Sequence, residues 1–228
     1  RNHAVWAPAA LATIEPDAPT QAELRAWLLD DQQPHLVLRA LEQQLEYLRG
    51  ELGRWAGNNL GRLRVQDALL HSWRRLPVHR QVLKLAGLGL SEDDFLNFPH
   101  LNGAFGHVRE LVLDNNPLRT LPTRLTCNFP DLRCLWANAA QLEHLPAGLG
   151  EQMTVMELHD NGITWTAQSQ AALDGYPRLE MLNLTGNPLR EAPNVSRLSE
   201  LNELSLSDTS ISRFPQGLEL LEDLQSLD

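Results

Sequence analysis

The sequence is poor in the residues on which several functional classes depend. It has one lysine, Lys84, and a formal net charge of −10, whereas a general nucleic-acid surface needs an excess of basic residues. Its two cysteines are too few for a disulfide framework. No apolar run approaches the roughly 18 residues that a membrane span needs. We therefore expect neither a nucleic-acid partner nor membrane insertion.

Leucine, by contrast, is abundant. The chain has 46 leucines among 228 residues, well above ordinary usage, although its hydrophobic content of 43% is normal. Leucine therefore replaces valine, isoleucine and phenylalanine, which indicates a repeated structural rule. The template L-x-x-L-x-L-x-x-N-x-L fits the chain at intervals of 21 to 28 residues. The second apolar position of successive copies is Leu83, Leu111, Leu135, Met156, Leu182, Leu204 and Leu227.

The template has a direct structural meaning. Its L-x-L pair alternates, so both leucines point to one side of a short strand and x points to the opposite, concave side. The asparagine can bond the backbone of the turn after each strand, so we expect Asn116, Asn161 and Asn187 to form a ladder, with Thr209 as a weaker substitute. The sequence predicts an α/β leucine-rich-repeat solenoid over residues 81–228, with about six complete copies and a truncated last one.

The N-terminal third follows a different pattern. We interpret the proline-containing residues 1–18 as a linker, and a capping box at residues 20–23 predicts a short helix. Apolar residues at spacings of three and four predict a long helix over residues 38–55, and a further helix over residues 65–75. We interpret residues 19–80 as a helical cap that covers the apolar edge of the first repeat.

Two further features connect the repeats with a known group of proteins. Asn-Pro-Leu turns recur at residues 116–118 and 187–189, and the segment Asp67-Ala-Leu-Leu-His-Ser-Trp-Arg-Arg75 precedes the repeats. With the Leu-Pro pairs that follow several copies, they resemble the middle section of large Pseudomonas-type proteins whose repeats precede a novel-class E3 ubiquitin ligase domain. Those proteins are relatives of secreted effectors of Shigella and Salmonella. The repeat resemblance covers about residues 82–228, although these repeats are longer and less regular than the effectors' repeats.

The resemblance implies a protein–protein interaction module that selects substrates or host targets for a ligase. It also implies synthesis in the bacterial cytoplasm and export into a host cell. The catalytic cysteine of such ligases lies in a Cys-x-Asp setting in a C-terminal domain. Cys127 and Cys134 are followed by other residues, so we interpret both as structural and expect no enzymatic activity from this chain. The eight histidines show no metal-ligand spacing, and we expect no metal or cofactor.

A second hypothesis is a structural or regulatory scaffold that packs against flanking domains of a larger bacterial protein and has no ligase role. The sequence that follows Asp228 would discriminate the two hypotheses. The scarcity of lysine is compatible with both. A GC-rich genome favours arginine and alanine codons, and a protein that works beside ubiquitin chemistry gains from lacking acceptor lysines.

The template also assigns side chains to the concave face, where we expect the partner to bind. The candidate residues are Val112, Asp114, Trp136, Asn138, Glu157, His159, Asp160, Asn183, Thr185, Ser205 and Ser207. Residues 81–228 hold nine basic and 20 acidic residues, a net charge of −11, so the expected partner is a protein with a basic surface. His159 and Asp160 are adjacent on one predicted strand, so their side chains should point to opposite faces unless the turn has already begun there, which argues against a catalytic pair.

Trp136 allows two interpretations. It is the one large aromatic residue in these columns and lies near their centre, which is typical of an interface hot spot. Alternatively, it covers an irregular third repeat in which Ala137 replaces a core leucine and the ladder asparagine is missing.

Overall fold

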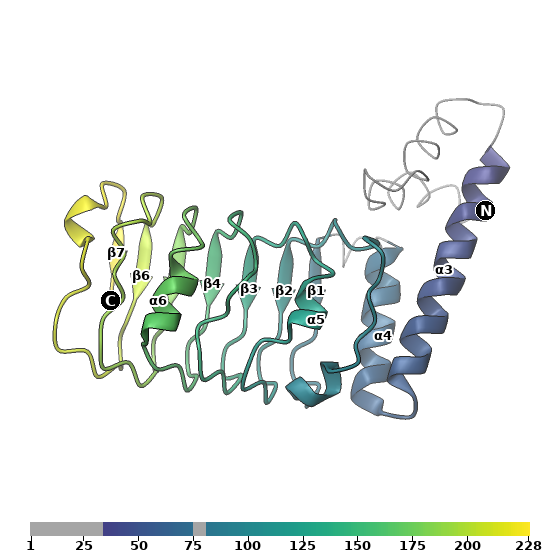
Figure 1. Cartoon of the computed structure of the whole chain (residues 1–228), viewed down its shortest axis with the longest axis horizontal. Helices are drawn as coiled ribbons and strands as arrows, with labels where there is room; N and C mark the ends of the chain where they lie inside the picture. The colour runs from purple at the N-terminus through teal and green to yellow at the C-terminus, as the bar shows by residue number, and fades with distance from the viewer. Residues whose placement is uncertain (1–33, 75–80) are drawn as a thin grey trace.

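The solenoid is built from very short strands, of which all but the last are centred on one buried apolar residue. The computed structural model describes residues 34–74 and 81–228, and in these ranges the strands form one parallel sheet in sequence order (Figure 1). The strands are β1 (Val82–Lys84), β2 (Glu110–Val112), β3 (Cys134–Trp136), β4 (Val155–Glu157), β5 (Met181–Asn183), β6 (Glu203–Ser205) and β7 (Ser226–Leu227). The predicted α/β leucine-rich-repeat solenoid is confirmed.

The register of the sheet aligns the template leucines. The central residues pair in turn as Leu83, Leu111, Leu135, Met156, Leu182, Leu204 and Leu227. In β1 to β6 these residues have 0% exposed surface, and each contributes roughly 1.5–3 kcal/mol of burial free energy. Because every central residue lies against its counterpart in the next strand, the core is a single continuous column.

A ladder of buried asparagines holds the turns that follow the strands. Asn187 shows its chemistry: Nδ2 donates to the backbone oxygens of Leu158 and Leu184, both at 2.9 Å, and Oδ1 accepts from the Ile163 N–H at 3.0 Å. One amide group therefore satisfies backbone atoms of its own repeat and of the repeat before it. The predicted ladder is confirmed at Asn116, Asn161 and Asn187.

Three repeats lack this asparagine: the first has Leu88 there, and the other two differ in how they compensate. At Ala140 the backbone oxygen accepts from the Leu118 N–H at 2.8 Å, in place of a side-chain amide. Thr209 donates through Oγ1 to the oxygen of Leu206 at 2.7 Å, within its own repeat. The threonine hydroxyl is shorter than an asparagine amide and donates only one hydrogen bond. The prediction that Thr209 substitutes for asparagine is therefore correct only for the bond inside the repeat.

The same turn forces one residue per repeat into the left-handed backbone region. Positive φ angles of +49° to +69° recur four residues after the central residue of each of the strands β1 to β6. The residues are Gly87, Asn115, Ala139, Asp160, Gly186 and Asp208. This region costs most L-residues about 1–2 kcal/mol, and glycine, asparagine and aspartate tolerate it best. Five of the six positions carry such a residue, and Ala139 is the exception.

The segments that return from strand to strand carry short helical turns. These are η2 (Glu92–Phe95), α5 (Thr123–Thr126), α6 (Ala167–Leu173) and η3 (Leu218–Leu220). α6 follows the N-cap residue Thr166, whose side chain accepts from the Ser169 N–H at 3.2 Å, and it lies inside the longer repeat between β4 and β5.

Two helices lie at the N-terminal end of the solenoid, α3 (Pro34–Ala56) and α4 (Leu60–Trp73) (Figure 1). α4 contacts β1, and α3 packs against α4. Trp55 joins the cap to the first repeat, because its Nε1 donates to the Asp94 oxygen at 2.8 Å and its ring stacks on Phe95. Arg62 pairs with the Asp94 carboxylate at 3.0 Å.

The helix boundaries differ in part from the sequence-based expectation. The predicted leucine stripe of α3 is buried at Leu41, Leu48 and Leu52. α4 begins at Leu60, earlier than the predicted residue 65, because the Asn59 side chain caps it by accepting from the Arg62 N–H. The predicted linker 1–18 and the capping box at 20–23 lie outside the described residues. None of the helices in residues 34–74 and 81–228 is long and apolar enough to cross a membrane.

We predict that the asparagine ladder is a major source of stability. Asn187→Leu removes three hydrogen bonds and leaves buried backbone groups without partners, which should cost about 3 kcal/mol. Thr209→Val removes one bond and should cost about 1 kcal/mol. Urea denaturation of both variants checks the contrast. Equal losses would show that the bridge between repeats contributes nothing beyond a local bond.

We predict that Ala139→Asn stabilises the protein by about 0.5–1 kcal/mol, because asparagine tolerates the left-handed backbone better than alanine. Ala139 is exposed, so the change disturbs no core packing. Ala139→Val should destabilise by a similar or larger amount, since a β-branched residue is strained there. Urea midpoints measured at constant m-value check this. A lower midpoint for Ala139→Asn would contradict the strain argument.

We predict that the two helices are needed to cover the first repeat. A chain beginning at residue 80 would expose Phe95 and Phe98, which now lie against Trp55, so it should aggregate or melt well below the full chain. Trp55→Ala in the full chain should cost about 3–5 kcal/mol for the same reason. Thermal unfolding followed by circular dichroism measures both. An unchanged melting temperature of the shortened chain would refute the cap interpretation.

Candidate functional site

The concave face displays two columns of side chains that flank the buried central column. The column after the central residues was assigned from the sequence, and the structure places it in one row across the sheet: Lys84, Val112, Trp136, Glu157, Asn183 and Ser205. Trp136 therefore lies between Val112 and Glu157. All three side chains are half-buried by their neighbours, so this row is a packed surface.

The column before the central residues was missed by the sequence analysis. It consists of Val82, Glu110, Cys134, Val155, Met181 and Glu203, all half-buried. The signal was available, because alternation along a strand exposes the residue before a buried position as well as the residue after it. Cys134, Val155 and Met181 stand side by side in β3, β4 and β5.

The two columns together give the concave face an apolar centre. Its members come from four neighbouring strands and are Val112, Trp136, Cys134, Val155 and Met181. Acidic residues on these strands, just after them or on the adjacent β6 frame this centre: Glu110, Asp114, Glu157 and Glu203. An apolar centre within a charged frame is the usual anatomy of a protein interface.

Glu157 is held in a defined position beside the apolar centre. The Asn183 Nδ2 donates to its carboxylate at 2.9 Å. Burial raises the pKa of Glu157 above its ordinary value, and the Asn183 bond and His159 oppose that rise. Its charge is therefore lost at higher pH than that of an exposed glutamate.

The candidates just after the strands support the backbone. Asp114 Oδ1 accepts from the Asn138 N–H at 2.8 Å, and Asn138 Oδ1 accepts from the His159 N–H at 3.0 Å. Thr185 and Ser207 are half-buried in the same row, and Thr185 donates its N–H to the Asn183 side chain. The structure thus brings all eleven predicted residues to one face. Several of them also accept hydrogen bonds from backbone N–H groups and so stabilise the turns.

For His159 and Asp160 the structure shows the exception that the sequence analysis named: the turn has begun, so the side chains do not point to opposite faces. β4 ends at Glu157, and Asp160 has a φ of +57°, so the chain has already turned. Their side chains meet, with His159 Nδ1 at 3.0 Å from Asp160 Oδ2. His159 is half-buried and Asp160 is exposed, and in the described parts of the chain no nucleophilic side chain forms a hydrogen bond with either. Across residues 34–74 and 81–228, no cluster of His, Cys, Asp and Glu side chains could hold a metal ion.

Trp136 and Ala137, which the alternative explanation connects, lie on opposite faces of the sheet. Ala137 is fully buried on the core side of the sheet, whereas Trp136 lies on the concave side. Successive side chains of a strand point to opposite faces, so the Trp136 ring cannot fill space beside Ala137.

The cysteines differ in exposure. Cys127 is exposed after α5, and Cys134 is half-buried. Burial raises the pKa of the Cys134 thiol, although Arg133 and a bond to Thr154 oppose the rise. A raised pKa lowers the thiolate fraction at neutral pH and makes Cys134 a poor nucleophile.

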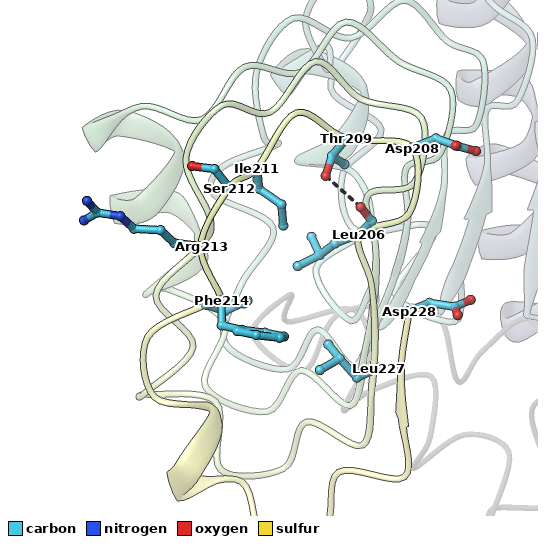
Figure 2. A pocket seen from close by; sticks show the side chains of 10 residues that line it. Leu206, Asp208, Thr209, Ile211, Ser212, Arg213, Phe214, Leu227 and Asp228 are labelled. Atoms are coloured by element: carbon cyan, nitrogen blue, oxygen red, sulfur yellow. Dashed lines mark hydrogen bonds between the residues drawn. The ribbon is translucent and has the colours of Figure 1, made fainter.

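A hollow of about 500 Å³ lies at the C-terminal end of the solenoid. Figure 2 shows that Leu206, Ile211, Phe214 and Leu227 project into it, while Arg213 points away. Leu206 and Ile211 are the counterparts of core positions that a neighbouring repeat covers elsewhere in the solenoid. The apolar lining is therefore the stacking surface of a repeat, and we assign it no small-molecule ligand.

Solved structures similar to this one include YopM and InlJ. YopM from Yersinia enterocolitica aligns with a TM-score of 0.58 and 23% identity over 81% of this chain and 37% of its own. InlJ from Listeria monocytogenes, whose functional domain is described as including a cysteine ladder, aligns with a TM-score of 0.57 and 18% identity over 78% of this chain and 37% of its own. No protein-family model matches the chain. The chain shares with both proteins the leucine-rich-repeat solenoid fold and spans little more than a third of either.

Proposed function

We propose that this chain is a protein-binding module whose concave face binds a partner with basic residues around an apolar group. The observation that carries the proposal is the apolar centre of the concave face, framed by acidic side chains. The partner's apolar group would lie against Trp136, and its basic residues would meet the surrounding carboxylates.

Physical reasons favour this surface. Trp136, Val155 and Met181 are only half-buried, so a partner can remove further apolar surface from water. Their strands are fixed by the hydrogen-bonded register, so little ordering free energy is lost on binding. The acidic frame attracts a basic partner over distances near the Debye length, which is about 8 Å at physiological salt.

We further propose that the module is the target-recognition region of a secreted, ubiquitin-ligase-type bacterial protein. The residues at 67–75 and the Asn-Pro-Leu turns support this through the resemblance that they carry. The solenoid fold shared with YopM and InlJ is compatible with it. Catalysis would belong to another domain, since the pKa of Cys134 is raised and Cys127 has no Cys-x-Asp setting. Reading the coding sequence beyond Asp228 for that setting tests this part of the proposal.

We predict that Trp136 dominates binding of the partner. A photo-crosslinking residue at Met181 should capture a partner protein, whereas the same residue at Gln168 on α6 should not. With the captured partner, Trp136→Ala should cost about 2 kcal/mol of binding, mostly through faster dissociation. Tyr47→Ala, a partly exposed aromatic on the cap, is the matched control.

The acidic frame should act mainly on association. Glu157→Gln combined with Asp160→Asn should slow association and flatten its dependence on salt, while Glu151→Gln should change neither. Surface plasmon resonance at several salt concentrations measures both rates. The concave face is not the site if Trp136→Ala and the double variant both leave affinity unchanged while the fold is intact.

A further inference from the structure

A second hollow lies on a different face of the solenoid. It is a groove of about 650 Å³ that crosses three consecutive repeats. Trp165 and the start of α6 line it in the first repeat, Arg190 and Ala192 in the second, and Arg213 and Phe214 in the third. None of these residues belongs to the concave columns. We call this hollow the lateral groove.

The lateral groove lies where Ala192 occupies a position that is leucine in two earlier repeats. The residue before proline in the returning segment is leucine in the Leu121-Pro122 and Leu145-Pro146 pairs, and phenylalanine in Phe214-Pro215. Leu145 is buried there, with 4% exposed surface. Ala192 occupies the same position before Pro193, and its methyl group leaves the space unfilled.

Backbone pairing along this face is interrupted at the groove and resumes just beyond it, where the Val195 N–H donates to the Gln216 oxygen at 2.8 Å. In earlier repeats the Glu143 N–H donates to the Arg119 oxygen at 3.0 Å, and the Thr164 N–H donates to the Glu143 oxygen at 3.3 Å. The equivalent N–H groups of Arg190 and Ser212 have no acceptor within the described residues. The groove therefore lies where hydrogen-bond donors of the backbone are unused.

The charge of the groove is opposite to that of the rest of the solenoid. Arg190 and Arg213 are exposed, and no carboxylate of the described ranges lies within ion-pair distance of either. Arg119 and Arg197, by contrast, pair with Glu143 and Asp174. Figure 2 shows the Arg213 side chain directed away from the C-terminal hollow. Among the lining residues, Glu191 is the one acid.

One wall of the groove is fixed in advance. Trp165 Nε1 donates to Gln170 Oε1 at 3.3 Å, and Gln170 Nε2 donates to the Asn194 oxygen at 2.9 Å. The Asn194 N–H returns a bond to Gln170 Oε1 at 2.9 Å. This network holds α6 against the next repeat, so a ligand that enters the groove meets an ordered wall.

We propose that the lateral groove binds an acidic segment of a partner protein, which sets one aliphatic side chain over Ala192 and its carboxylates on Arg190 and Arg213. Guanidinium groups bind carboxylates with paired hydrogen bonds, and the unused N–H groups are further donors to the same anions. Trp165, which is half-buried at the edge of the groove, gives the aliphatic side chain an apolar wall. This site goes beyond the concave face and selects a partner of opposite charge.

Synthetic peptides test the proposal. The probe is a fluorescein-labelled peptide with one leucine between two acidic residues on each side, and its counterpart has glycine in place of leucine. Fluorescence anisotropy should show saturable binding of the leucine peptide and about tenfold weaker binding of the glycine peptide. Amide shifts in NMR spectra of the ¹⁵N-labelled chain should map to Arg190, Ala192 and Ser212.

Variants of the chain separate this site from the concave face. Arg190→Glu with Arg213→Glu should abolish binding, and Ala192→Leu, which fills the groove without changing charge, should weaken it by about tenfold. Arg124→Glu on α5 and Trp136→Ala on the concave face should leave it unchanged. The proposal is overturned if the leucine peptide does not bind, if its shifts map elsewhere, or if a correctly melting Ala192→Leu variant binds it equally well.

Discussion

The fold depends on one constraint: a repeat can bury its central apolar residue only against the next repeat. A strand of three residues has too little surface to enclose Leu135 or Leu182, so burial requires stacking in register. Stacking in turn places the turns after each strand inside the molecule, where their backbone groups need partners. Asn161 and Asn187 supply those partners across the boundary between repeats. Spacing, register and the direction of every concave side chain follow from this arrangement.

The same constraint limits where functional information can reside. The turn requires a left-handed residue, and Asp160 and Asp208 satisfy it with side chains that tolerate this backbone. Asp114 caps the N–H of Asn138 in the neighbouring repeat. These acids have structural reasons to be present. The strand columns carry no such requirement, so the choice of Trp136 and Met181 there is more informative about binding.

Much of the fold, and less of the site, could be predicted from the sequence. The repeat template identifies Leu111 and Asn187 because each acts through its own chemistry at a fixed spacing. The contact of His159 with Asp160 could not be decided from the sequence because it depends on where β4 ends. The apolar centre was incomplete without Met181, since the template marks only the residue after the buried position.

The lateral groove could not be found from any single repeat. Nothing in the local sequence distinguishes Ala192. Its small size matters only by comparison with Leu145, which occupies the equivalent position of an earlier repeat and is buried. The free charge of Arg213 likewise depends on which carboxylates the neighbouring repeats bring near. Such features arise between repeats, so they are properties of the stack and not of a motif.

Two surfaces of opposite charge on one rigid stack have a consequence for binding. The concave face is acidic around Trp136 and the lateral groove is basic around Ala192, so a partner suited to one is repelled by the other. Coupling between the sites would require a change in how neighbouring repeats pack, because they share no side chain. The Asn161 and Asn187 bridges and the strand register oppose that change. The two sites should therefore bind independently, with affinities that multiply only when both ligands belong to one partner.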